Sequence, residues 1–462
     1  MDHPFVARER ELAGLERLYQ SPNFELAVIS GRRRIGKTAL ISRFIEDKPA
    51  IYYQGVETTA TNNRRFFAER VAEFSGDPTG AIYPDFGKLF DRIQQVADQQ
   101  SQKLVVVIDE YPYVAATDPA ISSLLQAAID HQFKAHRNIM LILCGSAMSF
   151  MEHQVLGAKS PLYGRRTMQL KLHPFTIFEV AQFLPTVPKP DLLAYLALTG
   201  GIPQYLSFVD PQRSLGENLT ALYLDPLAPL LQEPTMLIAQ ELRTPATYNG
   251  ILEAIAEGKT SPNQIAQAIG SQTGALYHYL DNLIDLEIIE KQVPVVGPKR
   301  RTSYRFKDEM YRFWFTFING QTERINRGRT KQMAKQILAD LPRFLGPTFE
   351  RACADWLWAQ EDLPLEPRAI GRWWGPNPAK HRQEELDLVA PADHDQAAIV
   401  GECKWRAADQ LTPAMLTVFQ ERLRLLPVAT TYPYFFVKQA GPDFKRVAAA
   451  QGVTVVDYQD FF

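Results

Sequence analysis

The sequence lacks the features of disulfide-stapled, secreted or membrane-embedded proteins. Its three cysteines, Cys144, Cys353 and Cys403, lie far apart and share no pairing or metal-ligand spacing, which favours a reducing compartment. The start of the chain, MDHPFVARERELAGL, mixes acids and bases where a signal peptide would be apolar. No apolar run approaches the about 18 residues that a membrane helix needs. We therefore expect a cytoplasmic protein with no membrane partner.

The chain also lacks a surplus of charge of either sign. It has 50 Lys and Arg against 52 Asp and Glu, a formal net charge of −2. It is therefore not a basic nucleic-acid coat, and any surface for a phosphate backbone must be local. The hydrophobic fraction of 46% is enough for several cores. A chain of 462 residues is expected to form about two to four domains.

Apolar β-type runs alternate with helical spacing in the first part of the chain. The runs are ELAVIS (25–30), AIYYQG (50–55), LVVVIDE (104–110) and NIMLILCGS (138–146). Strands buried on both faces of a parallel sheet have such nearly continuous apolar sequences. The rhythm predicts an α/β fold with a doubly wound parallel sheet.

The segment GRRRIGKT lies between the first apolar run and the helical pattern KTALISRFIED. It matches the P-loop pattern in full, in which glycines let backbone N–H groups cradle phosphate oxygens. Lys37 would reach the β- and γ-phosphates of ATP, and the Thr38 hydroxyl would bind Mg²⁺. The predicted nucleotide-binding residues are Gly31, Arg34, Ile35, Gly36, Lys37, Thr38 and Ala39.

Polar residues that follow the later strands are candidates for hydrolysis. Asp109 ends LVVVID and is predicted to hold Mg²⁺, directly or through water, while Glu110 would orient or deprotonate the attacking water. Ser146 would sense the γ-phosphate, or is simply a turn residue. In SPLYGRRT, Arg165 and Arg166 would act as arginine fingers, in cis or from a neighbouring molecule. The alternative for both is a surface ion pair.

Six segments together resemble the archaeal-type ATPase family of the AAA+/STAND group. They are FVAREREL, GRRRIGKT, VVVIDEYPY, LILCGSAMSFM, SPLYGRRT and TGGIPQYL, and the resemblance covers roughly residues 1 to 230. It implies an AAA-like ATPase core at 1–175 and a helical lid at 176–240. It also implies that residues 5–12 pack near the adenine and that Pro203 belongs to the lid motif over the nucleotide.

Residues 241–320 predict a winged helix-turn-helix, since three helical patterns precede a hairpin with a basic tip. Its second half is expected to bind DNA through a recognition helix in the major groove and phosphate contacts from the wing. The candidate residues are Gln272, Thr273, Tyr277 and His278 on the helix and Lys299, Arg300 and Arg301 on the wing. Because this helix carries no Arg or Lys, docking to a protein stays open. Residues 321–341 are basic and are expected to form a linker or an exposed helix start.

A less conspicuous set of charges lies in residues 342–462, where helical and β-type runs alternate again. Asp387 in ELDLVA is followed, after fourteen intervening residues, by Glu402 and Lys404 in GECKW. β alternation puts Glu402 and Lys404 on one face. Two carboxylates on paired strands can bind one or two Mg²⁺ ions, and a nearby lysine can position or activate water for attack on a phosphodiester. Glu350, on the preceding helix, would add a metal ligand.

This order of elements resembles the PD-(D/E)xK nuclease superfamily, and in particular a domain of unknown function often joined to archaeal-type ATPases. The resemblance implies a restriction-endonuclease-like fold with Asp387, Glu402 and Lys404 as the catalytic set and Glu350 as accessory. Leu386 stands where the superfamily's name has proline. The alternative is a binding domain on which Glu402 and Lys404 form a β-sheet ion pair.

Two functions of different class follow. The first is an ATP-binding and ATP-hydrolysing DNA-processing enzyme, in which the winged helix binds DNA and the C-terminal domain cuts it with Mg²⁺. The second is a STAND-type signalling switch, in which ATP controls assembly into a homo-oligomer, hydrolysis is slow and the nuclease-like fold only binds. A transcription regulator with an ATPase sensor is a third, weaker hypothesis.

Overall fold

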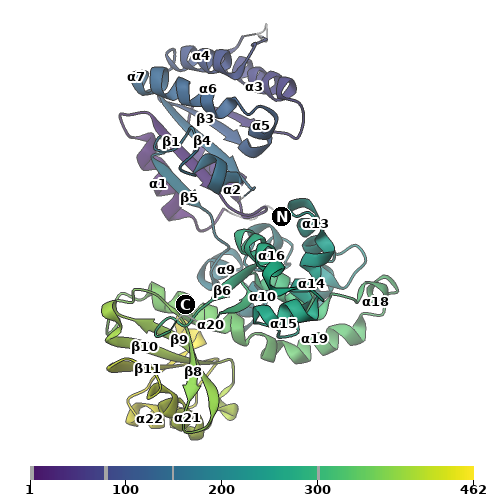
Figure 1. Cartoon of the computed structure of the whole chain (residues 1–462), viewed down its shortest axis with the longest axis vertical. Helices are drawn as coiled ribbons and strands as arrows, with labels where there is room; N and C mark the ends of the chain where they lie inside the picture. Colours follow the sequence, from purple (N-terminus) through teal and green to yellow (C-terminus); the bar gives the residue numbers. More distant parts are fainter. Residues whose placement is uncertain (1–4, 78–81, 148–149, 299–301) are drawn as a thin grey trace. The chain divides into compact units, whose positions relative to one another are not determined.

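The computed structural model describes residues 5–77, 82–147, 150–298 and 302–462. The chain divides into two compact units, Met1–Pro174 and Phe175–Phe462 (Figure 1). The first corresponds to the expected ATPase core. The expected lid, winged helix and nuclease-like domain all lie in the second. Within these described ranges, no helix is long and apolar enough to cross a membrane.

The first unit is built on a five-stranded parallel sheet in the order β2-β3-β4-β1-β5. The strands are β1 (Glu25–Ser30), β2 (Ala50–Gln54), β3 (Leu104–Asp109), β4 (Ile139–Gly145) and β5 (Met168–Lys171). Every residue of β1, β3 and β4 is buried, which confirms the predicted α/β fold. Because β4 lies between β1 and β3, the carboxyl ends of these three strands meet at one edge.

Helices of the first unit cover this sheet. They are α1 (Glu9–Tyr19), α2 (Lys37–Ile45), α3 (Ala60–Ser75), α4 (Phe86–Ala97), α5 (Tyr111–Thr117), α6 (Ile121–Ala128) and α7 (Lys134–His136), with π-helical turns η1 (Ile129–Phe133) and η2 (Met151–Val155). One core joins side chains of β1 to β4 with α3, α4 and α6, including the fully buried Phe67, Phe86 and Phe90. Helix α4 contributes to this core through one apolar face, on which Phe86, Leu89, Phe90 and Ile93 recur at helical spacing.

Helices fill the first part of the second unit. They are α9 (Ile177–Phe183), α10 (Lys189–Thr199), α11 (Pro203–Leu206), α12 (Leu215–Tyr223), α13 (Glu233–Glu241), α14 (Pro245–Ala256), α15 (Pro262–Ala268), α16 (Thr273–Asp285) and α17 (Glu309–Phe317). The hairpin of β6 (Ile289–Gln292) and β7 (Ser303–Phe306) follows α16, as three helices and a hairpin were expected. Ser261 caps α15 with a capping box, and Pro262 is its first residue.

The basic segment, expected as a linker or an exposed helix start, forms helices α18 (Thr322–Asn326) and α19 (Lys331–Phe344). In α19, Met333, Ile337 and Leu341 recur every four residues and are buried, and the helix packs against α12 and α20 (Gly346–Ala359). Basic side chains between these positions obscure the apolar spacing in the sequence.

The second unit ends in a mixed sheet of order β12-β11-β10-β9-β8. Its strands are β8 (Gly371–Asn377), β9 (Arg382–Pro391), β10 (Ala397–Lys404), β11 (Thr430–Val437) and β12 (Thr454–Asp457), with helices α21 (Pro413–Leu423) and α22 (Pro442–Ala450) and 3-10 turns η3 (Asp393–Asp395), η4 (Ala408–Gln410) and η5 (Tyr458–Phe461). The expected alternation of helical and β-type runs is present, and ELDLVA and GECK lie in β9 and β10. β8 was not expected, because GRWWGPN contains two glycines and a proline that argue against a strand.

The packing of α19 predicts a sharp contrast between two positions on one helix. Ile337→Ala should lower the free energy of unfolding of the second unit by about 2–5 kcal/mol, because it empties a buried site. Lys335→Ala, on the exposed face, should change it by less than about 0.5 kcal/mol. Urea unfolding followed by tryptophan fluorescence measures this unit, since all six tryptophans lie between 314 and 405. Equal effects would show that α19 does not pack as described.

Candidate functional sites

The P-loop connects β1 to α2 by a backbone that few residue types can adopt. Gly31 and Gly36 have φ of 156° and 93°, and Arg34 has a φ of 68°. A Cβ on Gly31 would lie 3.0 Å from the Leu172 carbonyl oxygen, so glycine is also required by the close approach of the chain after β5. Ile35 is buried and anchors the loop.

Lys37 is held inside this loop. It is 6% exposed, and its ammonium donates to the carbonyl oxygens of Gly31 and Arg32, both at 2.9 Å. Burial lowers the pKa of the ammonium, and the nearby Cys144, Glu110 and Asp109 act against that shift. Because both partners are neutral carbonyl groups, they do not cancel the positive charge of the ammonium, which is available to a phosphate oxygen.

Asp109 brings the P-loop and the acidic strand together. Its Oδ2 accepts hydrogen bonds from the Thr38 hydroxyl at 3.0 Å and the Tyr52 hydroxyl at 2.6 Å. The backbone N–H of Glu110 donates to Oδ1 at 2.9 Å. The structure therefore brings together the two residues expected to hold Mg²⁺, and hydroxyl and carboxylate oxygens are the donors that this ion prefers.

Glu110 follows Asp109 in the left-handed region, with φ of 48°. This turn aims its side chain toward the end of β4, where its Oε2 accepts from the Ser146 N–H at 3.2 Å and hydroxyl at 3.0 Å. Ser146 is therefore next to the carboxylate expected to act as base. Because β4 lies between β1 and β3, Ser146 stands at the same sheet edge as Asp109.

The two arginines of SPLYGRRT have protein partners in this structure. Arg165 Nε donates to both oxygens of Asp130 at 3.0 Å, and its Nη2 approaches Oδ2 at 2.5 Å. These hydrogen bonds lower the pKa of Asp130 to about 2. Arg166 donates to the Leu156 carbonyl at 2.9 Å. Pro203, expected over the nucleotide, is the first residue of α11 in the second unit.

Tyr52 was missed as a site residue. Its hydrogen bond to Asp109 depends on β2 pairing with β3, where Gln54 stands opposite Asp109. Burial, followed by Asp109, raises the pKa of its hydroxyl, so it stays a donor. The pattern AIYYQ contains the residue, but strand neighbours cannot be deduced from a single run.

The C-terminal charges meet across antiparallel strands. β9 and β10 pair with Gly401 opposite Leu388, which puts Asp387 beside Glu402. The Lys404 ammonium lies 3.2 Å from Asp387 Oδ2 and 2.8 Å from Glu402 Oε1. Burial alone would lower the pKa of Lys404, but the two carboxylates outweigh it and raise that pKa. All three residues of the expected catalytic set are therefore in contact.

Arg422, on α21, completes this cluster and was not expected. Its Nη1 donates to Glu402 Oε1 at 2.9 Å and its Nε to Glu384 Oε2 at 3.1 Å. The other oxygen of Glu402, Oε2, is buried without a hydrogen-bond partner. Burial, and next Asp387, raises the pKa of Glu402. An orphaned buried carboxylate oxygen beside a second carboxylate fits a cation ligand.

Glu350, on α20, is turned toward an arginine. Its Oε2 lies 3.1 Å from Arg372 Nη1. Burial, and next Asp387, raises the pKa of Glu350 to about 8. In the described part of the chain, no group of three or more His, Cys, Asp or Glu side chains is arranged to hold a metal ion. Glu350 is thus an ion-paired neighbour of Asp387, whose charge it senses.

The expected DNA-contacting residues are only partly described. Gln272, Tyr277 and His278 are exposed on or next to α16, and Thr273 donates to Asn263 Oδ1 at 3.0 Å. The wing residues Lys299, Arg300 and Arg301 lie outside the described residues.

Two protein families match this chain, one in its N-terminal part and one in its C-terminal part. Residues 5–209 match a family described as an ATPase domain predominantly from Archaea, and residues 314–414 match a family of archaeal and bacterial proteins of unknown function. An uncharacterized protein of Methanocaldococcus jannaschii is 34% identical over 418 residues, covering 87% of this chain and 88% of that protein. An uncharacterized ATP-binding protein of the same organism is 48% identical over 44 residues, 10% of this chain and 75% of that protein.

Two solved structures are similar in fold. The Walker-type ATPase of Pyrococcus abyssi has a TM-score of 0.49 and 20% identity, covering 67% of this chain and 96% of that one. The ORC2 protein of Aeropyrum pernix has a TM-score of 0.47 and 15% identity, covering 72% of this chain and 96% of that one.

The contacts of Lys404 predict that it also stabilises the fold. Lys404→Ala should lower the free energy of unfolding by about 1–3 kcal/mol, because it leaves the partly buried Asp387 carboxylate without its cationic partner. Adding Asp387→Asn should restore part of this loss. Lys380→Ala, which breaks an exposed ion pair with Glu421 in the same domain, should cost less than about 1 kcal/mol. Equal losses in urea unfolding would contradict the buried cluster.

Proposed function

The chain belongs to the family of ATPases found predominantly in Archaea, and from this premise we propose that it binds ATP with Mg²⁺ and hydrolyses it. One observation carries the proposal. The P-loop hydroxyl of Thr38 and the strand-end carboxylate of Asp109 are in hydrogen-bond contact at 3.0 Å. Two sequence motifs separated by about seventy residues thus converge on one point, as binding of a metal–nucleotide complex requires.

Each residue of this edge has a role in the proposal. The N–H groups of the loop and Lys37 bind the phosphates, and Thr38 and Asp109 hold Mg²⁺, which would neutralise charge developing on the phosphates. Glu110 accepts the proton of the attacking water. The Ser146 hydroxyl donates to the Glu110 carboxylate, so a γ-phosphate that accepted from this hydroxyl would compete with Glu110 and release the base.

Two expected nucleotide contacts require rearrangement or a partner. Arg165 would act as a finger only after leaving Asp130. Pro203 would complete the lid over the nucleotide, and Gly201 supports its position, because a Cβ there would lie 2.3 Å from the Phe175 carbonyl oxygen. This close approach fixes the turn that precedes α11.

The role of Glu110 is testable with an isosteric variant. Glu110→Gln should bind ATP and hydrolyse it about 10²–10⁴-fold more slowly, because the amide cannot accept the proton. Phosphate release and binding of a fluorescent ATP analogue measure the two effects. Lys37→Ala is the matched control and should lose binding itself. Turnover by Glu110→Gln at the rate of the parent protein would remove the residue from the base role.

We also propose that the C-terminal domain is a Mg²⁺-dependent deoxyribonuclease. The contact of Lys404 with both Asp387 and Glu402, and the unpartnered Oε2 of Glu402, support this role. Asp387 and Glu402 would hold the ion, and Lys404 would position the attacking water. DNA would be bound through α16, the hairpin after it and this domain.

A second candidate is a nucleotide-controlled switch that assembles into homo-oligomers and does not cut DNA. The cluster of Lys404, Arg422, Asp387 and Glu402 favours it, because protein cations already compensate carboxylates that a metal ion would otherwise need to compensate.

Cleavage of plasmid and branched DNA separates these candidates. The parent protein should cut at least one of these substrates with Mg²⁺ or Mn²⁺, and Glu402→Gln should cut neither, since its amide is a poor metal ligand that preserves the side-chain volume. Lys380→Ala serves as the control and should cut normally. Each reaction is run with and without ATP. Absence of cutting by the parent protein on every substrate would favour the switch.

A further inference from the structure

A cavity of about 1010 Å³ opens beside Asp387 inside the second unit. One wall comes from the β6–β7 hairpin and α17, and the other comes from α20, β8 and β9. Several contacts join these walls, among them the two that follow. The Val295 N–H donates to the Arg372 carbonyl at 3.0 Å, and Arg305 lies 3.3 Å from Glu385. The hairpin therefore covers the approach to the nuclease-like carboxylates.

The lining of this cavity is suited to an anionic chain. It includes seven Lys or Arg side chains against five carboxylates, Asp387 among them. Four of the charged residues, Lys291, Arg343, Arg368 and Asp340, are exposed at its rim, three cations against one carboxylate. The half-buried Phe317 also lines it, and an aromatic face can stack on an unpaired base.

The walls also contain unsatisfied polar atoms. Arg305 Nε, Arg372 Nε and Gln292 Oε1 are buried without a hydrogen-bond partner, and all three residues line the cavity. Such groups are rare in native structures and mark places where a ligand or water completes the bonding. The cavity between the β6–β7 hairpin and β8 is therefore suited to a polar ligand.

The size of the cavity restricts what can enter. Its volume is that of a pocket for a drug-sized ligand, about 300–1,000 Å³. A DNA duplex is too large, since even its major groove is wide enough to admit an α-helix. A few nucleotides of one strand fit this space, with phosphates near the arginines and a scissile phosphate toward Asp387.

We propose that this cavity binds a single-stranded DNA segment, so that the nuclease-like site receives unpaired strands and strand ends and not the interior of an intact duplex. That the bound strand is cut rests on the nuclease role proposed above. Binding of the strand does not depend on cleavage.

Binding is tested on full-length Glu402→Gln protein, so that no strand is cut. A fluorescein-labelled single-stranded oligonucleotide should bind at least about tenfold more tightly than the blunt duplex of the same sequence, by fluorescence anisotropy. Removing two rim charges with Lys291→Gln and Arg343→Gln should weaken single-strand binding and reduce the slope of log K against log salt by about 1.4. Equal affinity for the duplex would overturn the proposal.

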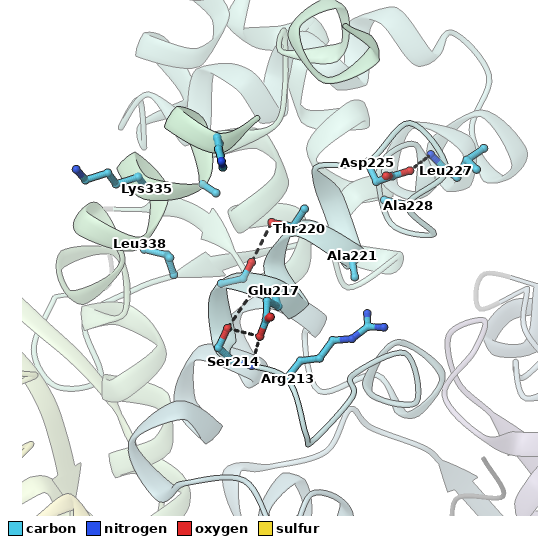
Figure 2. A pocket seen from close by; sticks show the side chains of 13 residues that line it. Arg213, Ser214, Glu217, Thr220, Ala221, Asp225, Leu227, Ala228, Lys335 and Leu338 are labelled. Carbon is cyan, nitrogen blue, oxygen red and sulfur yellow. Dashed lines mark hydrogen bonds between the residues drawn. The ribbon is translucent and has the colours of Figure 1, made fainter. Parts of the chain in front are cut away.

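The matched control removes two lysines at the other end of the helix that carries Arg343. Lys331 and Lys335 line a separate hollow between α12 and α19, where Lys335 extends away from Glu217 (Figure 2). Lys331→Gln with Lys335→Gln changes the net charge by the same amount and should leave single-strand affinity unchanged. Equal weakening by both pairs would reduce the effect to overall charge and overturn the assignment to this cavity.

A disulfide distinguishes entry into the closed cavity from opening of the hairpin. A Cβ at Gly371 would lie 3.2 Å from Val295 Cβ, close to the about 3.5–4.5 Å of disulfides. Oxidised Val295→Cys/Gly371→Cys protein should bind the single strand as its reduced form does. Loss of binding on oxidation would show that the hairpin must open, and would overturn the proposal. If the parent protein cuts no DNA in the cleavage assay, the nuclease proposal fails, but these binding results still test the single-strand proposal.

Discussion

The first unit depends on the insertion of β4 between β1 and β3 in a sheet buried on both faces. Burial fixes the register of these strands, because each residue of β1, β3 and β4 packs on a helix layer or a neighbouring strand. Their carboxyl ends must then share one edge, so the P-loop, Asp109 and Ser146 meet whatever their separation in sequence. The geometry of the phosphate site is a consequence of strand order. The hydrogen bond from Thr38 to Asp109 forms because this order brings the ends of β1 and β3 to one edge.

The C-terminal domain depends on a different constraint, the compensation of buried charge. Glu402 and Glu384 are nearly inaccessible, and Arg422 joins them while Lys404 joins Glu402 to Asp387. Desolvation makes each charge expensive unless another compensates it. The same network that keeps the domain folded is therefore the one that a metal ion or a phosphodiester would have to rearrange, which couples binding at this site to local stability.

Most of the fold and much of the site could be predicted from sequence, for reasons that differ between residues. Long apolar runs and a complete P-loop identify the parallel sheet, and β alternation places Glu402 beside Lys404. Tyr52 and Arg422 could not be predicted, because their roles depend on which strand or helix lies beside them. β8 could not be predicted because its glycines and proline argue against a strand. The apolar spacing of α19 is obscured by the basic residues between its buried positions. Sequence patterns report the chain's local preferences, whereas these contacts arise from pairing of distant segments.

The ion pair between Arg165 and Asp130 has a consequence for timing. An arginine engaged by two carboxylate oxygens has a resting conformation, and any task elsewhere is done only by the fraction of molecules in which it is free. If the pair is worth about 1 kcal/mol, that fraction falls roughly fivefold. In the proposed finger role, Arg165 would have to leave Asp130, and a neighbouring molecule that offered Asp130 another cation would free it more often without contacting the nucleotide.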